Sequence, residues 1–155
     1  LVKQVLIIDL DVHQGNGTAK LFENNPRVFT FSMHGKHNYP FHKEKSDLDI
    51  DLNDGTDDAT YLGLLEQHLD RLITTVQPDF VFYLSGVDIL DTDKFGKLKV
   101  TPAGCKKRDE MVFTALRDNG IPCTVAMGGG YSPDIKLIVE AHCNTFRAAR
   151  NLYDL

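Results

Sequence analysis

The chain has 155 residues, of which 42% are apolar, and it carries 22 acidic against 17 basic side chains, a formal net charge of −5. This length and composition suit one globular domain with a sizeable core, and the acidic balance leaves no electrostatic footprint for nucleic acid or a membrane surface. No apolar run approaches the roughly 20 residues of a membrane span, and no signal peptide is evident. Cys105, Cys123 and Cys143 form no C-x-x-C pair. Their spacing argues against disulfides and cysteine-bound zinc and favours a reducing compartment, the cytoplasm or, in a eukaryote, also the nucleus.

The first strand is expected over residues 5–12, where four apolar residues come before a polar alternation. Asp9, Asp11 and His13 stand at alternate positions, so their side chains share one face of an extended chain. Unpaired buried carboxylates cost roughly several kcal/mol each, and this trio therefore requires a cation nearby, most simply a metal ion. The chain starts at Leu1 without Met and enters this strand almost at once, which predicts that it was cut from a longer protein.

Buried apolar runs then alternate with amphipathic helical patterns, which predicts an α/β fold around a mainly parallel sheet, in one domain over residues 1–155. A long loop is expected at 34–45. Thr101 and Pro102 mark the start of one helix, and Ser132 with Pro133 is expected to cap the last one. Further strands are expected at 28–33, 47–52, 79–84 and 122–127, and helices at 19–24, 59–76, 101–118 and from 133 onward.

The histidines outside the first strand are expected to be structural or solvent-exposed. His34, His37 and His42 are isolated in the long loop, and no catalytic role is assigned to them. His68 and His142 fall on apolar helix stripes and are expected in the core, because no second ligand stands beside either of them. The stripe of the last helix is expected to pack inward through Ile135, Ile138, Val139, His142, Phe146 and Ala149.

Polar residues gather where the predicted strands end. In open parallel sheets, ligands bind beyond the carboxyl ends of the strands. Asp11 and His13, then Asp88, then Tyr131 each stand at or just past such an end. Two carboxylates and one imidazole leave an open coordination position, which suits a hydrolytic metal. Zinc is the first choice and ferrous iron the second, since nitrogen and oxygen ligands do not separate them decisively.

Three stretches resemble one known family. They are DLDVHQGNG at 9–17, GVDILDTDKFGKL at 86–98 and GGGY at 128–131. These motifs, in this order, are similar to those of the zinc-dependent histone deacetylase superfamily, and TPAGCKKRDEMVF at 101–113 with Gln14 and Asn16 resembles its class IV branch most. The resemblance implies the three-layer α/β/α arginase-deacetylase fold. It covers nearly the whole chain, which matches only the C-terminal half of the family's catalytic domain and so is expected to be incomplete at its N-terminus.

By this resemblance, the expected reaction is zinc-dependent hydrolysis of N-acyl-lysine in a protein or peptide. Asp11, His13 and Asp88 are the implied zinc ligands, and Tyr131 is implied to stabilise the oxyanion of the tetrahedral intermediate. Tyr39 falls where the family places an aromatic channel wall, and the glycines before Tyr131 are implied to let the acyl-lysine channel approach the backbone. The glycines concerned are Gly129 and Gly130.

The resemblance also implies structural monovalent cations, such as potassium. Asp9 matches a buried acid that shares one such site with oxygens of Asp11, His13 and Ser32. A second site is implied at the backbone of three residues further along the chain, Phe22, Asn25 and Val28.

The chain departs from the family in one respect that matters for activity. The family's general base is one of two adjacent histidines in an earlier segment, and residues 1–155 contain no His-His pair. Besides the deacylase, two hypotheses therefore stay open. One is a hydrolase of small amides, either an acylpolyamine deacetylase or an arginase-like enzyme, although the latter needs more carboxylates than Asp11 and Asp88 supply. The other is a catalytically inactive module that binds acyl-lysine.

Overall fold

A five-stranded sheet with every pairing parallel forms the centre of the molecule, and its strand order is β3-β2-β1-β4-β5. The computed structural model describes residues 1–153. Its strands are β1 (Val5–Asp9), β2 (Val28–Gly35), β3 (Leu48–Leu52), β4 (Phe80–Gly86) and β5 (Cys123–Gly128), and its helices are α1 (Asn16–Phe22), α2 (Asp58–Val76), α3 (Pro102–Asp118) and α4 (Ile135–Tyr153).

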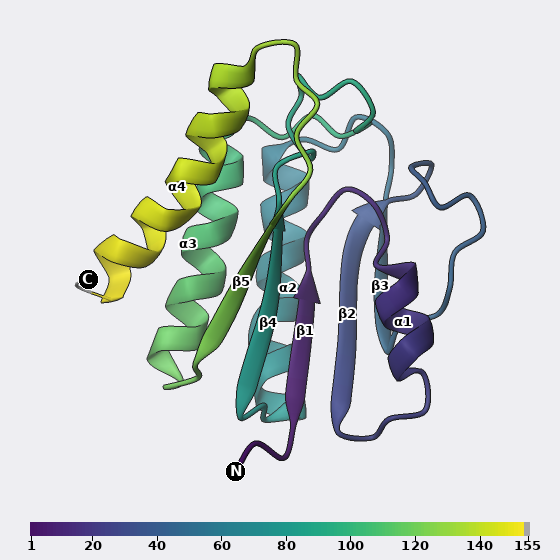
Figure 1. Ribbon diagram of the computed structural model, residues 1–155, viewed down its shortest axis with the longest axis vertical. Helices are drawn as coiled ribbons and strands as arrows, with labels where there is room; N and C mark the ends of the chain where they lie inside the picture. Colours follow the sequence, from purple (N-terminus) through teal and green to yellow (C-terminus); the bar gives the residue numbers. More distant parts are fainter. Residues whose placement is uncertain (154–155) are drawn as a thin grey trace.

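The helices cover the sheet unequally. In Figure 1, α2 and α3 lie behind the sheet and α4 packs along α3 beside the β5 edge, whereas α1 lies on the front side, next to β2 and in front of β3. The predicted α/β architecture with a parallel sheet and flanking helices is therefore confirmed. Because the strands run parallel, their carboxyl ends all meet at the upper edge of the sheet in this view, where the polar motifs follow.

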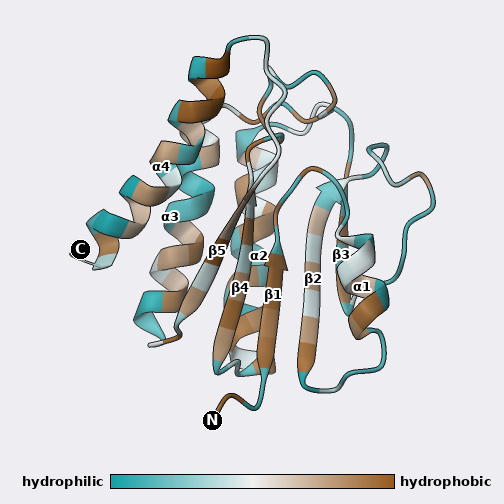
Figure 2. Ribbon diagram, viewed as in Figure 1, coloured by the Kyte–Doolittle hydropathy of each residue, from teal (hydrophilic) through white to brown (hydrophobic). Residues whose placement is uncertain are grey.

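The core lies between the sheet and the rear helices. Leu6 and Ile8 of β1 pair in register with Val81 and Tyr83 of β4, and all four side chains are fully buried. Figure 2 shows the same central strands as the most hydrophobic part of the sheet. Strands buried in this way are continuous apolar runs, which is why the sequence pattern located them.

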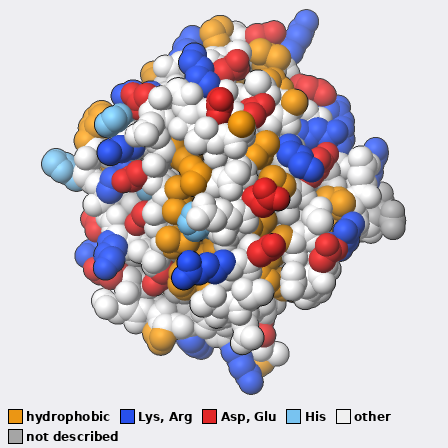
Figure 3. Space-filling view, turned by 180° about the vertical axis from the view of Figure 1, so that it is seen from behind, with side chains coloured by type: hydrophobic (Ala, Val, Ile, Leu, Met, Phe, Trp, Pro, Cys, Tyr) orange, Lys and Arg blue, Asp and Glu red, His pale blue; other side chains and the backbone are white. Residues whose placement is uncertain are grey.

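The outer surface carries mixed charge. Figure 3 views the molecule from the side of the rear helices and shows Lys and Arg interspersed with Asp and Glu. At 19 residues each, α2 and α4 are the longest helices within residues 1–153, and neither is apolar enough to cross a membrane.

Several predicted boundaries differ from the structure near the site. The first strand ends at Asp9 rather than Val12, because the chain bends as soon as the Asp9 carboxylate accepts a hydrogen bond from the backbone of Asp11. His34 was expected in a loop but belongs to β2 and is fully buried. The short helix α1 starts earlier than expected, at Asn16.

The last helix is the largest correction. It begins at Ile135, and Asp134 rather than Ser132 accepts from its first turn, through a 2.9 Å hydrogen bond from the Lys136 backbone. The predicted inward stripe is largely on the outside, since Ile135, Val139 and Phe146 are more than half exposed. α4 packs instead through Ile138 and smaller residues, which let it approach α3 closely: Ala141, Thr145 and Ala148. His68 and His142, expected in the core, are half-buried.

Candidate metal centre

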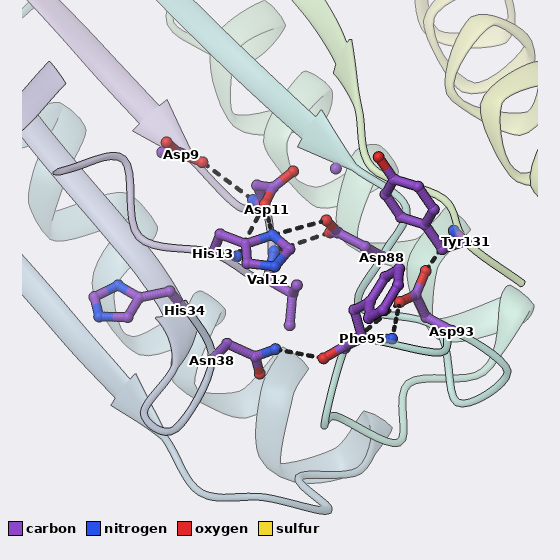
Figure 4. A network of polar contacts seen from close by, with 12 residues as sticks. Asp9, Asp11, Val12, His13, His34, Asn38, Asp88, Asp93, Phe95 and Tyr131 are labelled. Carbon is purple, nitrogen blue, oxygen red and sulfur yellow. Dashed lines mark hydrogen bonds and ion pairs between the residues drawn. The ribbon is translucent and has the colours of Figure 1, made fainter. Parts of the chain in front are cut away.

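Three side chains from two neighbouring strand ends converge on one point. Asp11 and His13 lie in the bend that follows β1, and Asp88 lies two residues beyond β4 (Figure 4). Nδ1 of His13 lies 3.0 Å from Oδ1 of Asp11 and 3.2 Å from Oδ2 of Asp88. One ligand atom from each residue lies within 4.8 Å of the other two. The predicted ligand set is thus brought together.

The cluster stabilises positive charge. Hydrogen bonds to the carboxylates of Asp11 and then Asp88 raise the pKa of His13 to about 10, in spite of partial burial. Burial raises the pKa of Asp88 above its ordinary value, although His13 opposes this. Burial also acts to raise the pKa of Asp11, but its hydrogen bonds with His13 outweigh burial and lower it. Such a site favours a cation at its centre.

The geometry fits a divalent metal ion. Ligands of a tetrahedral zinc ion at typical bond lengths lie about 3.3 Å apart, close to both distances from His13. Asp88 is buried to 1% exposure, whereas the side chains of Asp11 and His13 are 20% and 30% exposed. The cluster therefore opens to solvent on one side, as a catalytic metal site requires.

Asp9 lies behind this cluster, at the end of β1. It is 4% exposed, and burial raises its pKa to about 7. Its register partner across the sheet is Ser32 of β2, which places the two side chains on the same face. The structure therefore groups Asp9 with Ser32 and with the backbone N–H of Asp11. The Ser32 hydroxyl also contacts Nδ1 of His34 at 2.9 Å.

The three residues of the second predicted cation site share a turn between α1 and β2. The Asn25 backbone N–H donates to the Phe22 carbonyl at 2.9 Å, and the Val28 N–H donates to the Asn25 carbonyl at 3.0 Å. The turn is therefore held by its own backbone, and the carbonyls of Phe22 and Asn25 each accept one of these hydrogen bonds.

Tyr131 follows a glycine turn that packs against Asp88. Gly129 and Gly130 have φ of +68° and +109°, a backbone region that favours glycine, and a Cβ at Gly129 would overlap the Asp88 carboxyl group. The Tyr131 backbone N–H donates to Oδ2 of Asp93 at 2.7 Å, and its ring packs edge to face on Phe95, with centroids 5.1 Å apart. The Tyr131 side chain is 56% exposed and stands on the Asp88 side of the cluster (Figure 4).

A cavity of about 290 Å³ opens beside His13. Tyr39, Phe41 and Phe95 are its aromatic walls, and each of these rings is at least 60% exposed. The rings of Tyr39 and Phe41 meet edge to face at 6.2 Å. An aromatic-lined cavity next to a charged centre suits an apolar stem that carries a polar reacting group. Tyr39 is therefore one wall of a cavity beside His13.

The family model described as histone deacetylase domain matches residues 1–146. The chain belongs to the histone deacetylase family. An uncharacterized protein of Picosynechococcus sp. is 46% identical over 153 residues, 99% of this chain and 51% of that protein. Histone deacetylase 2 of Arabidopsis thaliana is 38% identical over 133 residues, 84% of this chain and 34% of that protein.

Two solved structures have a similar fold. Acetylpolyamine aminohydrolase from Burkholderia pseudomallei has a TM-score of 0.83 at 21% identity, covering 97% of this chain and 46% of that one. The HDA15 HD domain has a TM-score of 0.76 at 25% identity, covering 97% of this chain and 51% of that one. The chain, a member of the histone deacetylase family, therefore spans about half the length of the Picosynechococcus protein and of the two solved structures. It spans 34% of the Arabidopsis protein.

Two residues that hold the loops around the cavity in this family member, Asp93 and Asn38, were not singled out from the sequence. Asp93 caps the loop after β4, because its Oδ1 accepts from the backbone of Phe95 and Gly96, each at 2.8 Å, while Oδ2 holds Tyr131. Asn38 joins the cavity wall to the same loop through a 2.7 Å hydrogen bond to the Phe95 carbonyl. Asp93 stands within the GVDILDTDKFGKL motif, which was a usable signal, whereas Asn38 carried none.

Proposed function

We propose that the protein is a metal-dependent hydrolase that removes acyl groups from the side-chain nitrogen of lysine in a protein or peptide. The observation that carries the proposal is the convergence of Asp11, His13 and Asp88 beside an aromatic-lined cavity in a chain of the histone deacetylase family. Relatives named as histone deacetylases support a deacetylase-type reaction. The compact ligand set supports zinc, with ferrous iron as the alternative.

The proposed roles follow from the position of each side chain. Asp11, His13 and Asp88 hold the ion, and a zinc ion bound there supplies Lewis acidity and lowers the pKa of water to about 7. Tyr131, on the loop that packs against Asp88, donates its hydroxyl to the oxyanion that develops on the amide carbonyl. Tyr39 and Phe95 flank the methylene stem of the lysine, and the backbone at Gly129 and Gly130 leaves room for the acyl group.

We also propose two sites for monovalent cations, one of them behind the three metal ligands. Asp9 and Ser32, adjacent on one face of the sheet, are proposed to share a potassium ion with oxygens of Asp11 and His13. Burial of Asp9 supports this role, because an ionised buried carboxylate requires a neighbouring positive charge. The turn formed by Phe22, Asn25 and Val28 is the proposed second site.

We further propose that residues 1–155 are one domain equivalent to the C-terminal half of a deacetylase catalytic domain. The coverage of the relatives, 51% of one and 34% of another, supports this assignment. The residues of this chain supply the ligands and the oxyanion donor but no adjacent histidine pair. The proton carrier is accordingly proposed to lie in the part of the family domain that this chain does not span.

Class and compartment are narrower parts of the proposal. Similarity of the 101–113 stretch to class IV enzymes supports membership of that branch. Because this resemblance leaves a preference for long acyl groups open, the assay includes substrates with long acyl chains. Free thiols at Cys105, Cys123 and Cys143 support a reducing compartment such as the cytoplasm.

The test combines metal content with turnover. A longer protein, which joins residues 1–155 to the proposed proton-carrying part of the domain, is loaded with zinc and assayed on peptides that carry short and long acyl-lysine, with products separated by chromatography. His13→Ala and Asp88→Ala are expected to lose both zinc and hydrolysis, whereas the control His68→Ala, a half-buried histidine on α2, is expected to keep both. Hydrolysis by metal-free His13→Ala protein would refute the proposal.

Other outcomes separate the competing functions. The acetylpolyamine aminohydrolase neighbour makes acylated polyamines the second substrate class, and turnover of these alone would place the enzyme among the small-amide hydrolases. Two manganese ions per chain would indicate arginase-like chemistry. Micromolar affinity for acyl-lysine peptide with no product after long incubation would indicate a binding module.

A further inference from the structure

Arg108, in the middle of α3, is a fully buried charged side chain at 0% exposure. A guanidinium without water needs a counter-ion and hydrogen-bond acceptors. Asp109 supplies the counter-ion: its Oδ1 accepts from Nε of Arg108 at 2.9 Å and lies 2.8 Å from Nη2. The remaining contacts of the guanidinium point toward the sheet.

Those contacts reach the two strand ends that carry the candidate ligands. Nη1 of Arg108 donates to the Gly86 carbonyl at 2.5 Å and to the Leu10 carbonyl at 3.3 Å. Leu10 directly precedes Asp11, and Gly86 lies two residues before Asp88. One side-chain nitrogen therefore joins the ends of β1 and β4 where the chain leaves the sheet.

The backbone pairing explains why such a link is needed. The Leu10 N–H donates to the Leu84 carbonyl at 3.1 Å, and the chain after Leu10 then bends, whereas β4 continues to Gly86. Further along, the two segments meet through the Val12 N–H, which donates to Oδ1 of Asp88 at 3.0 Å, and through Nδ1 of His13, 3.2 Å from Oδ2 of Asp88. Arg108 lies between these contacts and the hydrogen bond of Leu10, and it braces the segments from the helix side.

Asp109 is itself held from two directions, so the guanidinium has a rigid anchor. The Tyr83 hydroxyl of β4 donates to its Oδ1 at 2.5 Å, and the Thr145 hydroxyl of α4 donates to its Oδ2 at 2.6 Å. The network thus ties α3 to β4 and α4. Arg108 connects this network to the ends of β1 and β4, through the carbonyls of Leu10 and Gly86.

We propose that Arg108 is a positioning residue of the metal centre, which sets the separation of the Asp11–His13 segment from Asp88 by holding the carbonyls of Leu10 and Gly86. This inference rests on the proposed function in that it takes these three residues as metal ligands. Arg108 touches no ligand side chain and is not a catalytic residue. Its action on the site passes through the backbone.

The variants must separate positioning from simple loss of folding stability. Arg108→Lys keeps a positive charge beside Asp109, but a single ammonium cannot reproduce the planar fork that reaches Asp109 and both carbonyls. The double variant Arg108→Gln/Asp109→Asn removes both buried charges together, so that neither remains unpaired. Thr145→Val is the matched control, because it removes a hydrogen bond from the same network on the side away from Leu10 and Gly86.

The experiment measures zinc affinity of the intact protein by competition with a chromophoric chelator, the visible spectrum of the cobalt-substituted protein, and urea unfolding of the metal-free form. Arg108→Lys and the double variant are expected to weaken zinc binding about 10- to 100-fold, the usual effect of losing a residue that orients metal ligands. Their cobalt spectra are expected to change, whereas Thr145→Val lowers stability but keeps wild-type affinity and spectrum.

Two results would overturn the inference, and they are distinguishable. Wild-type affinity and spectrum in both Arg108 variants, with only reduced stability, would make Arg108 a purely structural residue while leaving the proposed function intact. A wild-type protein that binds no zinc would remove the proposed metal centre, and this inference with it.

Discussion

The Val12 backbone N–H donates a 3.0 Å hydrogen bond to Oδ1 of Asp88 and so joins the bend after β1 to the segment after β4. The other oxygen of Asp88, Oδ2, lies 3.2 Å from Nδ1 of His13. Asp88 therefore has two separable functions, one carried by each oxygen. Oδ1 holds the segment that carries Asp11 and His13 in place, and Oδ2 faces the point on which the three candidate ligands converge.

Because the two oxygens of Asp88 make different contacts, two substitutions of this residue are expected to have different effects. Asp88→Asn keeps an oxygen that can accept from Val12 and removes a buried charge, so the metal-free protein is expected to stay as stable as wild type while zinc binding is lost. Asp88→Ala also leaves the Val12 N–H without its acceptor, which is expected to cost a further 1–3 kcal/mol, roughly, of unfolding free energy. Urea unfolding and chelator competition measure the two quantities, and equal stability of the two variants would contradict the prediction.

Metal loading is expected to stabilise the fold, since the proposed ligands come from segments that separate on unfolding. Free zinc at a hundred times its dissociation constant is expected to add about 2.7 kcal/mol and to raise the melting temperature by about 5–10 °C. Excess chelator is expected to reverse the shift. Asp88→Asn serves as the control and should show no shift, and an equal shift in that variant would place the zinc elsewhere.

The start of α4 gives a prediction that separates the observed helix from the expected one. Asp134 accepts from the Lys136 backbone at 2.9 Å, so Asp134→Ala is expected to lower stability by about 1 kcal/mol. Ser132→Ala, at the position first expected to be the cap, is expected to change it by less than about 0.5 kcal/mol. Chemical denaturation of both variants measures the difference, and the reverse order would restore the cap at Ser132.

The sequence was most informative where buried strands lead into polar motifs. Asp11, His13 and Asp88 were found because parallel strands deliver their carboxyl ends to one edge, and this topology follows from the alternation of strands and helices. The precise end of the first strand could not be foreseen. Alternation at Asp9, Asp11 and His13 suggested a continuing strand. In the structure the Asp9 and Asp11 carboxylates accept hydrogen bonds from the backbone N–H groups of Asp11 and His13, and the chain turns there.

Packing partners were harder to predict than elements. The apolar stripe of α4 was visible, but a stripe does not say which neighbour covers it, and the helix packs on α3 through Ala141, Thr145 and Ala148 instead. Arg108 stands within the 101–113 stretch, but nothing in the sequence indicated that it is buried, because a charged residue in an amphipathic helix is normally on the solvent side. Its burial depends on acceptors from Leu10 and Gly86, which lie far away in the sequence.

Gly129 lies against Asp88 in a backbone conformation that favours glycine. Gly129 has φ +68°, and a Cβ there would overlap the carboxyl group of Asp88, so Gly129→Ala combines backbone strain with displacement of a ligand. It is expected to lower stability by at least about 2 kcal/mol and to weaken zinc binding as well. Gly63→Ala is the matched control, because Gly63 is exposed within α2 with no atom near the added Cβ, and this change is expected to stabilise the protein by about 0.5–1 kcal/mol. Denaturant unfolding and chelator competition on both variants measure these effects, and unchanged zinc affinity in Gly129→Ala would mean that Asp88 can move without loss of the site.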